Sequence, residues 1–413
     1  MHRRTFISLL LVSFCFIANS QSRNLDFYIN EGLRNSPLLN DYRNQIKSAS
    51  SDSLLVLAAK KPLIEANSQL QYSPYYDHFG YDEVLTDGGN YMAVMGVSQK
   101  ILNKKETENK YRSVELQKQL ILNESGKSVT ELNKIITDQY LASFSTLTDL
   151  VFNTTFLDLL QKENEIVKQF VKNGLGKQTD YLTLMIEAQS QEILVAQLKN
   201  QYRKDLILLN DLCGINDTVV YKLDEPHLFI KGMPEIKKSP YYLQFKIDSA
   251  RIENEKLAID ISYKPKVSWF ADAGFLTSNP WNFYQHFGYS AGMSLNIPIY
   301  DGKQKELEKQ KLGYEENTRK AYENKYHLQY FQQVRQLEAE LKTLNDVSLR
   351  IDKQLQTSDQ LVKSLKEQLE SGIILMTEYI NAVKNYRTTS RNMNMLKIQK
   401  LQVINEMNFL LTQ

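Results

Sequence analysis

Hydrophobic and polar residues alternate with a period of two in four stretches of the chain. In the clearest stretch, 289–297, apolar residues at odd positions alternate with Ser290, Gly292, Ser294 and Asn296. A period of two predicts a β-strand with one apolar and one polar face. The other three predicted strands cover 64–72, 91–101 and 267–275. The pattern therefore predicts two amphipathic hairpins.

Two long tracts without proline, 103–172 and 303–370, predict exceptionally long helices. At 1.5 Å per residue, each helix measures about 100 Å, or roughly three times the thickness of a bilayer core. Each tract ends at a glycine, Gly174 or Gly372, which suits a left-handed helix cap. A helix of about half that length follows each glycine. Ten positions in the second tract, eight of them apolar, alternate steps of four and three, which is the seam of a coiled coil: Leu337, Leu341, Leu344, Ser348, Ile351, Leu355, Ser358, Val362, Leu365 and Leu369.

The same order of strands and long helices occurs twice. Several residues of the first half recur 198 positions later, and others recur 203 positions later. Pairs at the first offset include Tyr91 with Tyr289, Ala93 with Ala291, Met95 with Met293, Gly174 with Gly372, and Tyr181 with Tyr379. An ordered series of this kind predicts an internal tandem duplication. The predicted parts are a first repeat at 21–212, a connector at 213–235 with a strand-like run at 219–221, and a second repeat at 236–413.

Residues 1–20 have the pattern of an export signal. Arg3 and Arg4 precede an apolar run that ends in small residues before Gln21. The run is too short to span a membrane as a helix, and the rest of the chain contains no apolar run of 18 residues. Any membrane crossing by the mature chain must therefore use strands.

Composition excludes several functions. The full chain has 50 basic and 48 acidic side chains. Removal of residues 1–20 takes away two arginines and leaves a net charge near zero, which gives no reason to expect nucleic acid as a partner. Cys213 is the single cysteine left, and we expect a buried, inert thiol. We expect no catalytic residue, metal or cofactor, because the sequence contains no catalytic motif. The histidines stand apart from other metal-binding side chains: His78, His227, His286 and His327.

Four strands cannot close a barrel, because bacterial outer-membrane barrels need at least about eight. An open edge in lipid leaves backbone groups unsatisfied, at several kcal/mol each. We therefore predict a fold that is mainly α with β, in which four strands contribute to an oligomeric transmembrane β-barrel and a long α-helical coiled-coil barrel continues it. Four strand residues are expected to face lipid: Trp269, Ala271, Met293 and Leu295.

These features resemble the TolC family of outer-membrane efflux and secretion ducts. The resemblance rests on the strand–helix junction IPIYDGKQKELEKQK and on the helix-turn segments KNGLGKQTDYL and LESGIILMTEYI. It covers nearly the whole mature chain. It implies a homotrimer in the outer membrane, with a twelve-stranded barrel in lipid and a helical barrel in the periplasm. The implied partners are a periplasmic adaptor and an inner-membrane transporter, whose substrates the duct conducts passively.

The resemblance also points to the turns that follow the long helices. Asp180 comes six positions after Gly174, and Glu378 six positions after Gly372. In the family, acidic side chains at this periplasmic end make the duct cation-selective. The family's closing network uses a tyrosine before the glycine and an arginine after it; Leu369 and Ile374 stand there in this chain, so a different closing contact is expected.

Two other classes of protein remain open. A periplasmic coiled-coil adaptor or structural protein without a pore would share the long helices, but not two amphipathic hairpins joined directly to them. A porin-like uptake channel would share the strands, but not the long helices. The sequence does not identify the exported substrate or the pump.

Overall fold

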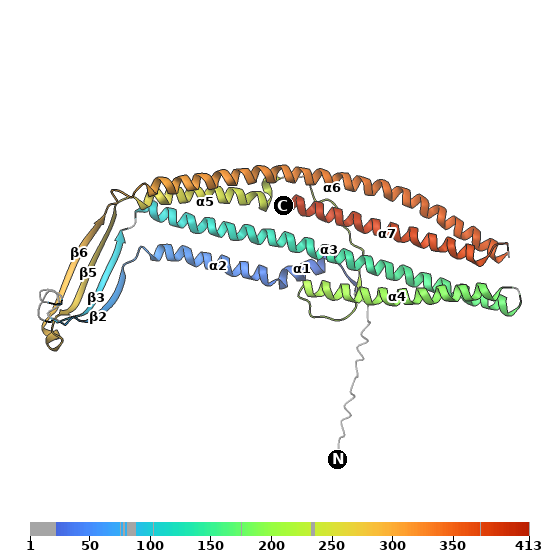
Figure 1. Ribbon diagram of the computed structural model, residues 1–413, viewed down its shortest axis with the longest axis horizontal. Coiled ribbons are helices and arrows are strands. Elements are labelled where there is room, and N and C mark those ends of the chain that lie inside the picture. The colour runs from blue at the N-terminus through green and yellow to red at the C-terminus, as the bar shows by residue number, and fades with distance from the viewer. Residues whose placement is uncertain are drawn as a thin grey trace, which may run out of the picture. The chain divides into compact units, whose positions relative to one another are not determined.

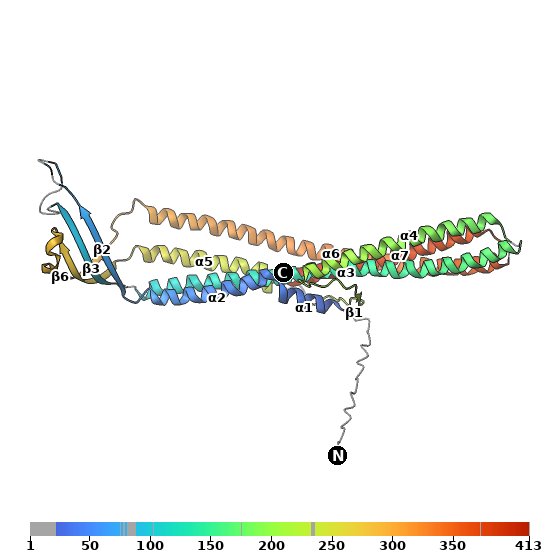
Figure 2. The ribbon, with the colours of Figure 1, turned by 90° about the horizontal axis from the view of Figure 1, so that it is seen from below.

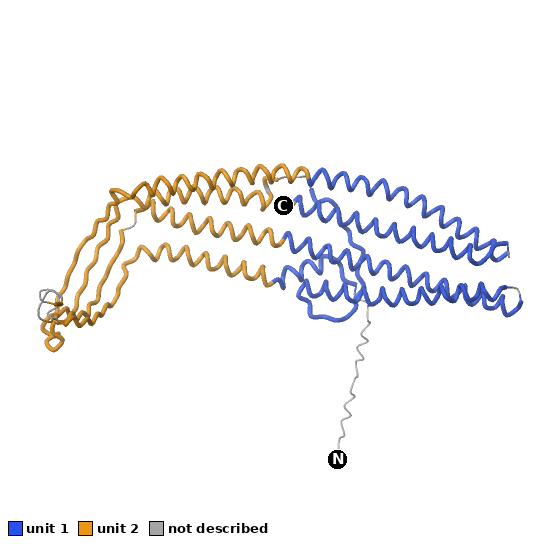
Figure 3. The backbone as a smooth tube through the Cα atoms, viewed as in Figure 1, with its two compact units in different colours: residues 1–36, 130–233, 333–411 blue, residues 37–129, 234–332, 412–413 orange. Residues whose placement is uncertain are grey.

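The computed structural model describes residues 22–74, 76, 79–80, 88–101, 103–174, 176–232, 236–371 and 373–412. The predicted signal, residues 1–20, and Gly372 lie outside the described residues. The chain forms two compact units, and each unit draws residues from both sequence repeats (Figure 3). The first unit comprises 1–36, 130–233 and 333–411, and the second 37–129, 234–332 and 412–413. The boundaries of the sequence repeats stay a prediction.

The second unit contains a four-stranded antiparallel sheet (Figure 1). Its strands are β2 (Leu63–Tyr72), β3 (Gly89–Ile101), β5 (Lys266–Thr277) and β6 (Phe287–Asn296), in that spatial order, and the 3-10 helix η2 (Pro280–Gln285) lies between β5 and β6. Both predicted hairpins are present. Extending the last strand to Ile297 was wrong: Asn296 pairs with Lys266, the first residue of β5, so a partner strand is lacking beyond it. Pro298 then has no N–H to donate.

Four helical segments complete the second unit. They are α2 (Pro37–Ala58), α5 (Pro240–Ser262) after the short η1 (Ile236–Lys238), and the first parts of α3 (Lys104–Lys172) and α6 (Gln304–Glu370). Asn109 on α3 donates to the carbonyl of Asn254 on α5 at 2.8 Å, and Asn254 donates back to the carbonyl of Asn109 at 3.2 Å. A side-chain amide that bonds a particular carbonyl favours one longitudinal alignment of the two helices, because sliding would leave polar groups unpaired.

The first unit is built around the rest of α3 and α6. It also contains α1 (Leu25–Asn35), α4 (Gln178–Leu212), α7 (Met376–Thr412) and two short parallel strands, β1 (Ser22–Arg23) and β4 (Lys222–Leu223). One buried core joins α1, α3 and α4 to the segment after α4: Tyr28, Ile136, Tyr140, Leu147, Tyr202, Leu206, Leu209, Cys213 and Leu223. Burial raises the pKa of the Cys213 thiol to about 12, as expected for an inert core cysteine.

The predicted strand-like run at 219–221 was wrong by position, since the strand forms at Lys222–Leu223 instead. The side chain of Tyr221 serves another contact, in which the Arg23 guanidinium lies 3.6 Å from the centre of its ring. The Tyr140 hydroxyl lies 3.1 Å from the carbonyl oxygen of Arg23 and 2.7 Å from that of Asp224. The Tyr140 hydroxyl thus bridges the backbone of β1 and that of the residue after β4.

The predicted coiled-coil seam of α6 is confirmed. All ten seam positions from Leu337 to Leu369 are partly shielded from solvent. Val362, Leu365 and Leu369 pack against the second core of this unit, to which α7 contributes. The alternation of four and three therefore marks the side of α6 that meets other helices.

Helix α6 begins at a turn in which Asp301 caps the first backbone groups. Gly302 and Lys303 both have positive φ, 65° and 68°. The Asp301 carboxylate accepts hydrogen bonds from the backbone N–H of Lys303 at 2.9 Å and of Lys305 at 2.8 Å. These bonds, with one from the Tyr263 hydroxyl, lower the pKa of Asp301, while the Asp301 carboxylate raises the pKa of Tyr263 to about 12. Asn103 occupies the matching position before α3, and its side-chain oxygen accepts a hydrogen bond from the backbone N–H of Lys105 at 3.1 Å.

This cap predicts an acid-sensitive start of α6. A carboxyl whose pKa is lowered by folding stabilises the folded state above its ordinary value near 4, and the contribution is lost as the pH falls through the lower folded value. Hydrogen exchange of the first-turn amides, corrected for intrinsic rates, should show constant protection from pH 7 to 5 and a loss below about pH 4. In Asp301→Asn the loss of protection at low pH should be smaller. The loss that remains is due to Asp260, because hydrogen bonds from Lys309 and Lys305 lower the pKa of its carboxyl. Asp359→Asn, further along α6, is the control and should keep the wild-type profile; an unchanged profile in Asp301→Asn would refute the prediction.

Candidate functional site

One face of the four-stranded sheet is mainly apolar. The register aligns Trp269 with Met293, Ala271 with Ala291, and Val267 with Leu295. Trp269, Ala271, Met293 and Leu295 therefore lie on the same face of the sheet. Further residues of all four strands share that face: Ile64, Ala66, Leu70, Tyr91, Ala93, Met95, Val97, Ala273, Phe275, Phe287 and Tyr289. Met293 and Leu295 are 73% and 63% exposed, so the chain itself leaves this apolar face uncovered.

The opposite face is mainly polar or small. Ser290, Gly292, Ser294 and Asn296 lie on it, together with residues of the other three strands: Glu65, Asn67, Gln69, Ser98, Gly96, Ser268 and Asp272. The Ser290 hydroxyl donates to the Asp272 carboxylate at 2.8 Å. Phe270 is an exception, and its ring lies over Gly292, where a Cβ would come within 2.7 Å of it. Glycine at 292 thus lets the ring lie along the sheet.

Gln99 is one of three polar residues on the mainly apolar face, together with Ser68 and Thr277. The indole N–H of Trp269 donates to its side-chain oxygen at 3.1 Å, and its amide nitrogen donates to the Lys60 carbonyl at 2.6 Å. Both ends of the amide therefore have partners at the helix-side end of the sheet. The tryptophan joins an apolar face to a polar end, an arrangement common at membrane–water interfaces.

The outer strands of the sheet are β2 and β6. Within the part of the chain that the structure describes, neither pairs with a strand on its outer side. Their directions alternate, β2 running away from the helices and β6 back toward them, so another β2 beside β6 would again be antiparallel. The sheet thus has two free edges that could complement each other between copies.

The second candidate site consists of the turns after the long helices. Gly174 has φ 71°, and its N–H donates to the Val171 carbonyl at 3.1 Å, which gives α3 the expected left-handed cap. Asp180 lies in the first turn of α4 and is half-buried. Glu378 lies in the first turn of α7 and is exposed. Gly372 lies outside the described residues, so its predicted role has no structural description.

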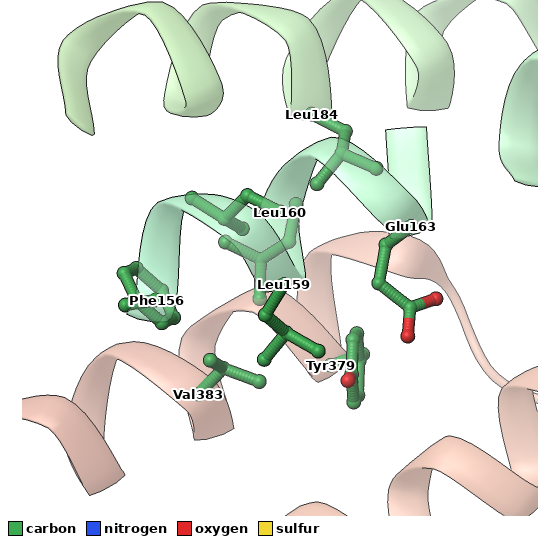
Figure 4. Close-up of a pocket in the computed structure, with 8 residues that line it drawn as sticks. Phe156, Leu159, Leu160, Glu163, Leu184, Tyr379 and Val383 are labelled. Carbon is green, nitrogen blue, oxygen red and sulfur yellow. The ribbon is translucent and has the colours of Figure 1, made fainter. Parts of the chain in front are cut away.

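The helices on either side of these turns share a compact core. It contains Phe156, Leu160 and Val167 of α3, Leu184 and Ala188 of α4, and Met376, Tyr379, Ile380 and Val383 of α7. Figure 4 shows Phe156, Leu160, Leu184, Tyr379 and Val383 around a cavity of about 10 Å³. A volume of this size holds at most one water molecule, so the region is packed protein rather than a ligand pocket.

Ion pairs join the two long helical hairpins beside this core, and the sequence analysis missed them. Glu163 on α3, itself 7% exposed, accepts from Lys366 on α6 at 2.9 Å. Glu187 on α4 and Lys384 on α7 are 2.7 Å apart. Hydrogen bonding to Glu163 raises the pKa of Lys366, and burial, with the nearby Glu163, raises the pKa of Tyr379. The position of Lys366 beside the seam residue Leu365 was the available sequence signal.

A buried amide adds a third link between the hairpins. Gln191 of α4 is 1% exposed; its amide nitrogen donates to the Asn153 carbonyl at 2.9 Å, and its oxygen accepts from Arg387 of α7 at 2.8 Å. Because both ends of the amide are bonded, loss of either partner would leave a buried polar group unpaired. The end of the first unit that carries the two turns is therefore held by polar contacts as well as by its core.

Metal and membrane criteria add two observations. Among the described residues, no three His, Cys, Asp or Glu side chains lie close enough together to hold a metal ion. None of the helices in the described ranges is both long and apolar enough to cross a membrane.

Solved structures match nearly the whole chain. CusC matches with a TM-score of 0.76 and 13% identity over 94% of this chain and 91% of its own. The outer membrane protein VceC from Vibrio cholerae matches with a TM-score of 0.73 and 13% identity over 94% and 96% of the two chains. The Neisseria gonorrhoeae MtrE outer membrane channel, in its open state, matches with a TM-score of 0.74 and 11% identity over 94% of this chain and 88% of its own.

The chain has the TolC fold. The sequence matches no protein-family model, and no curated protein matches it. At 11–13% identity, the likeness to these channels concerns the fold. The predicted fold class is confirmed, with long helices and a small antiparallel contribution of strands. In this chain, Glu163, Glu187 and Gln191 make the polar links beside the turns.

The Glu163–Lys366 pair supplies a prediction about stability near the turns. Lys366→Met leaves a nearly buried carboxylate without its partner and should destabilise the local structure by about 2 kcal/mol. Hydrogen exchange at the ends of α3 and α6 should then rise about 30-fold, since 1.36 kcal/mol corresponds to a factor of ten. Lys363→Met is the matched control, because Lys363 pairs with Asp359 on the helix surface at 2.6 Å; it should change exchange less than threefold. Equal effects of the two changes would contradict the prediction.

Proposed function

We propose that the protein is an outer-membrane duct, the exit channel of a tripartite efflux pump or a type I secretion system. The observation that carries the proposal is the sheet: four strands with one apolar face, one polar face and two free edges, in a chain with helices of 69 and 67 residues. An apolar outer face suits lipid and a polar inner face suits a water-filled pore. Proteins of the same fold include the MtrE outer membrane channel.

The proposed duct is a homotrimer in the outer membrane, with its helices in the periplasm. Four strands per copy are too few to close a barrel, and unpaired strand edges are costly in lipid. Three copies would supply twelve strands. A periplasmic adaptor and an inner-membrane transporter are the proposed partners, as the resemblance to the TolC family implies, and the protein would conduct substrates without catalysing a reaction.

A periplasmic adaptor or structural protein without a pore is the alternative. The apolar sheet face argues against it, because an adaptor in water would leave side chains such as Tyr289 and Met293, 88% and 73% exposed, in contact with solvent. In lipid the same exposure is favourable. The sheet therefore favours the duct.

We propose that Trp269, Ala271, Met293 and Leu295 contact lipid. Arginine near the bilayer midplane costs about 2–4 kcal/mol on the lipid face of a barrel. Ala271→Arg should therefore reduce assembled protein in the outer membrane by at least tenfold at equal expression. Ser294→Arg, on the polar face of the adjacent strand, is the control and should reduce it much less. Equal losses in the two variants would exclude this assignment of faces.

We also propose that Gly174, Gly372, Asp180 and Glu378 belong to the periplasmic end of the duct. In a trimer, each acidic position would recur three times around the axis. A ring of carboxylates attracts cations over about 8–10 Å at physiological salt. Their other role is to complement the helix N-terminus, worth about 0.3–1 kcal/mol, which half-buried Asp180 and exposed Glu378 can both fulfil.

Planar-bilayer recordings of the purified protein test the function. Trimers that insert and conduct would support the duct, and a protein that stays monomeric, soluble and non-conducting would support the adaptor. The wild-type channel should prefer cations, and Glu378→Gln should move the reversal potential in a salt gradient toward zero. Glu370→Gln, which alters a residue of α6 just before the turn, is the control for charge loss in the same region. An unchanged reversal potential in Glu378→Gln would leave Glu378 only its role at the helix end.

A further inference from the structure

Helices α3, α4 and α7 lie together in the first unit (Figure 2), and side chains of all three line a cleft of about 310 Å³. The lining side chains recur about one turn apart on each helix, so each helix presents one face to the cleft. They are Asp149, Phe152 and Asn153 of α3, Leu194 and Leu198 of α4, and Arg387, Thr388, Arg391, Asn392 and Met395 of α7. The volume is at the lower end of the range for small-molecule sites, roughly 300–1,000 Å³. The cleft is therefore large enough for a ligand, unlike the packed core beside the turns.

The cleft has a charged end and an apolar end. The two polar contacts between α4 and α7 described above show that these helices run in the same direction. Arg387 bonds Gln191 at one end of the cleft. Two turns further along both helices, Leu198 of α4 and Met395 of α7 line the other end. Arg391 follows Arg387 by one turn, so both guanidinium groups belong to the charged end and its border with the apolar end.

Arg387 is held in position by the protein itself. One of its terminal nitrogens donates to the Gln191 side-chain oxygen at 2.8 Å, and its guanidinium carbon lies 5.3 Å from the centre of the Phe156 ring. A guanidinium has five N–H donors, and within the described residues Gln191 is the one hydrogen-bond acceptor that Arg387 has. Its planar, permanently charged fork suits a carboxylate. Arg387 therefore offers fixed cationic donors to the cleft that the fold leaves unused.

Arg391 and Asp149 form an incomplete pair in the same cleft. The Arg391 Nε atom lies 3.7 Å from the Asp149 carboxylate, which is too far for a hydrogen bond. The Arg391 side chain is 62% exposed, whereas that of Asp149 is 16% exposed. Burial raises the pKa of Asp149, so its surroundings stabilise the carboxylate only in part. Two guanidinium groups and one carboxylate give the cleft a net positive charge.

We propose that the cleft binds a small amphiphilic organic anion, whose carboxylate lies between Arg387 and Arg391 and whose apolar body contacts Leu198 and Met395. A neutral ligand would leave the unused donors without an anion, and a cation would meet a net positive charge. An apolar body is needed because one end of the cleft has no charged side chain among its lining residues. The site lies within one chain, so the inference does not depend on the proposed duct.

A matched pair of probes tests the ligand class. 2-Naphthoate carries one carboxylate on a rigid apolar body, and 2-naphthamide has the same shape without the charge. Calorimetric titration of the purified protein in a non-ionic detergent at pH 7, with detergent alone as the blank, should show one saturable naphthoate site per chain. The amide should bind at least tenfold more weakly, because charge-assisted hydrogen bonds are about twice as strong as neutral ones. Bound naphthoate should slow hydrogen exchange at 149–153 and 387–395; no saturable binding, or equal binding of acid and amide, would overturn the proposal.

Two variants of the cleft should change naphthoate binding in opposite directions. Arg391→Gln removes one cationic donor and should raise the Kd at least tenfold. Asp149→Asn removes the carboxylate that competes for Arg391 and should lower the Kd at least threefold. Arg203→Gln is the control for loss of one positive charge, since Arg203 is exposed on α4 and does not line the cleft, and its Kd should stay within twofold of the wild type.

The variants leave Arg387 unchanged, because it also bonds the buried Gln191 amide and its loss would disturb the fold. Circular dichroism should show the same helix content in all three variants. Equal effects of Arg391→Gln and Arg203→Gln would mean that naphthoate responds only to the overall charge of the protein, and would overturn the site. Weaker binding in Asp149→Asn would contradict the proposed place of the carboxylate.

Discussion

The backbone groups on the outer edges of β2 and β6 are the constraint on which the proposed assembly depends. The inner strands β3 and β5 form hydrogen bonds with a strand on each side. Each outer strand leaves one row of N–H and C=O groups without a strand partner in the described chain. Water can satisfy such groups, whereas hydrocarbon cannot. A sheet with an apolar face and two free edges is therefore unsuited to lipid as a single copy and suited to it as part of a closed ring.

The helices are joined by a combination of apolar seams and specific polar bonds. An apolar seam of repeated leucines permits sliding by whole turns, because the same kind of side chain recurs. Asn109 with Asn254 in one unit, and Gln191 with Asn153 in the other, bond particular backbone carbonyls and so favour one alignment. The structure thus uses apolar packing for cohesion and a few buried amides for register.

Two polar contacts hold the backbone at the start of α6 and beside the turns. At the strand–helix junction, the Asp301 carboxylate accepts hydrogen bonds from backbone N–H groups at the start of α6, which have no carbonyl partner within the helix. Near the turns, the Glu163 carboxylate accepts a hydrogen bond from the Lys366 ammonium and so connects α3 to α6.

The periodicity of the sequence predicted the long helices, the two hairpins and the faces of their strands. A period of two and a seven-residue seam follow directly from strand and helix geometry, so the faces of β5 and β6 and the seam of α6 could be predicted without coordinates. Tertiary structure alone decided that β3 joins β5, that β4 lies at 222–223 rather than 219–221, and that Glu163 meets Lys366 across 203 positions. These contacts join residues far apart in the chain, and no local period records which distant partner a side chain or a strand edge will meet.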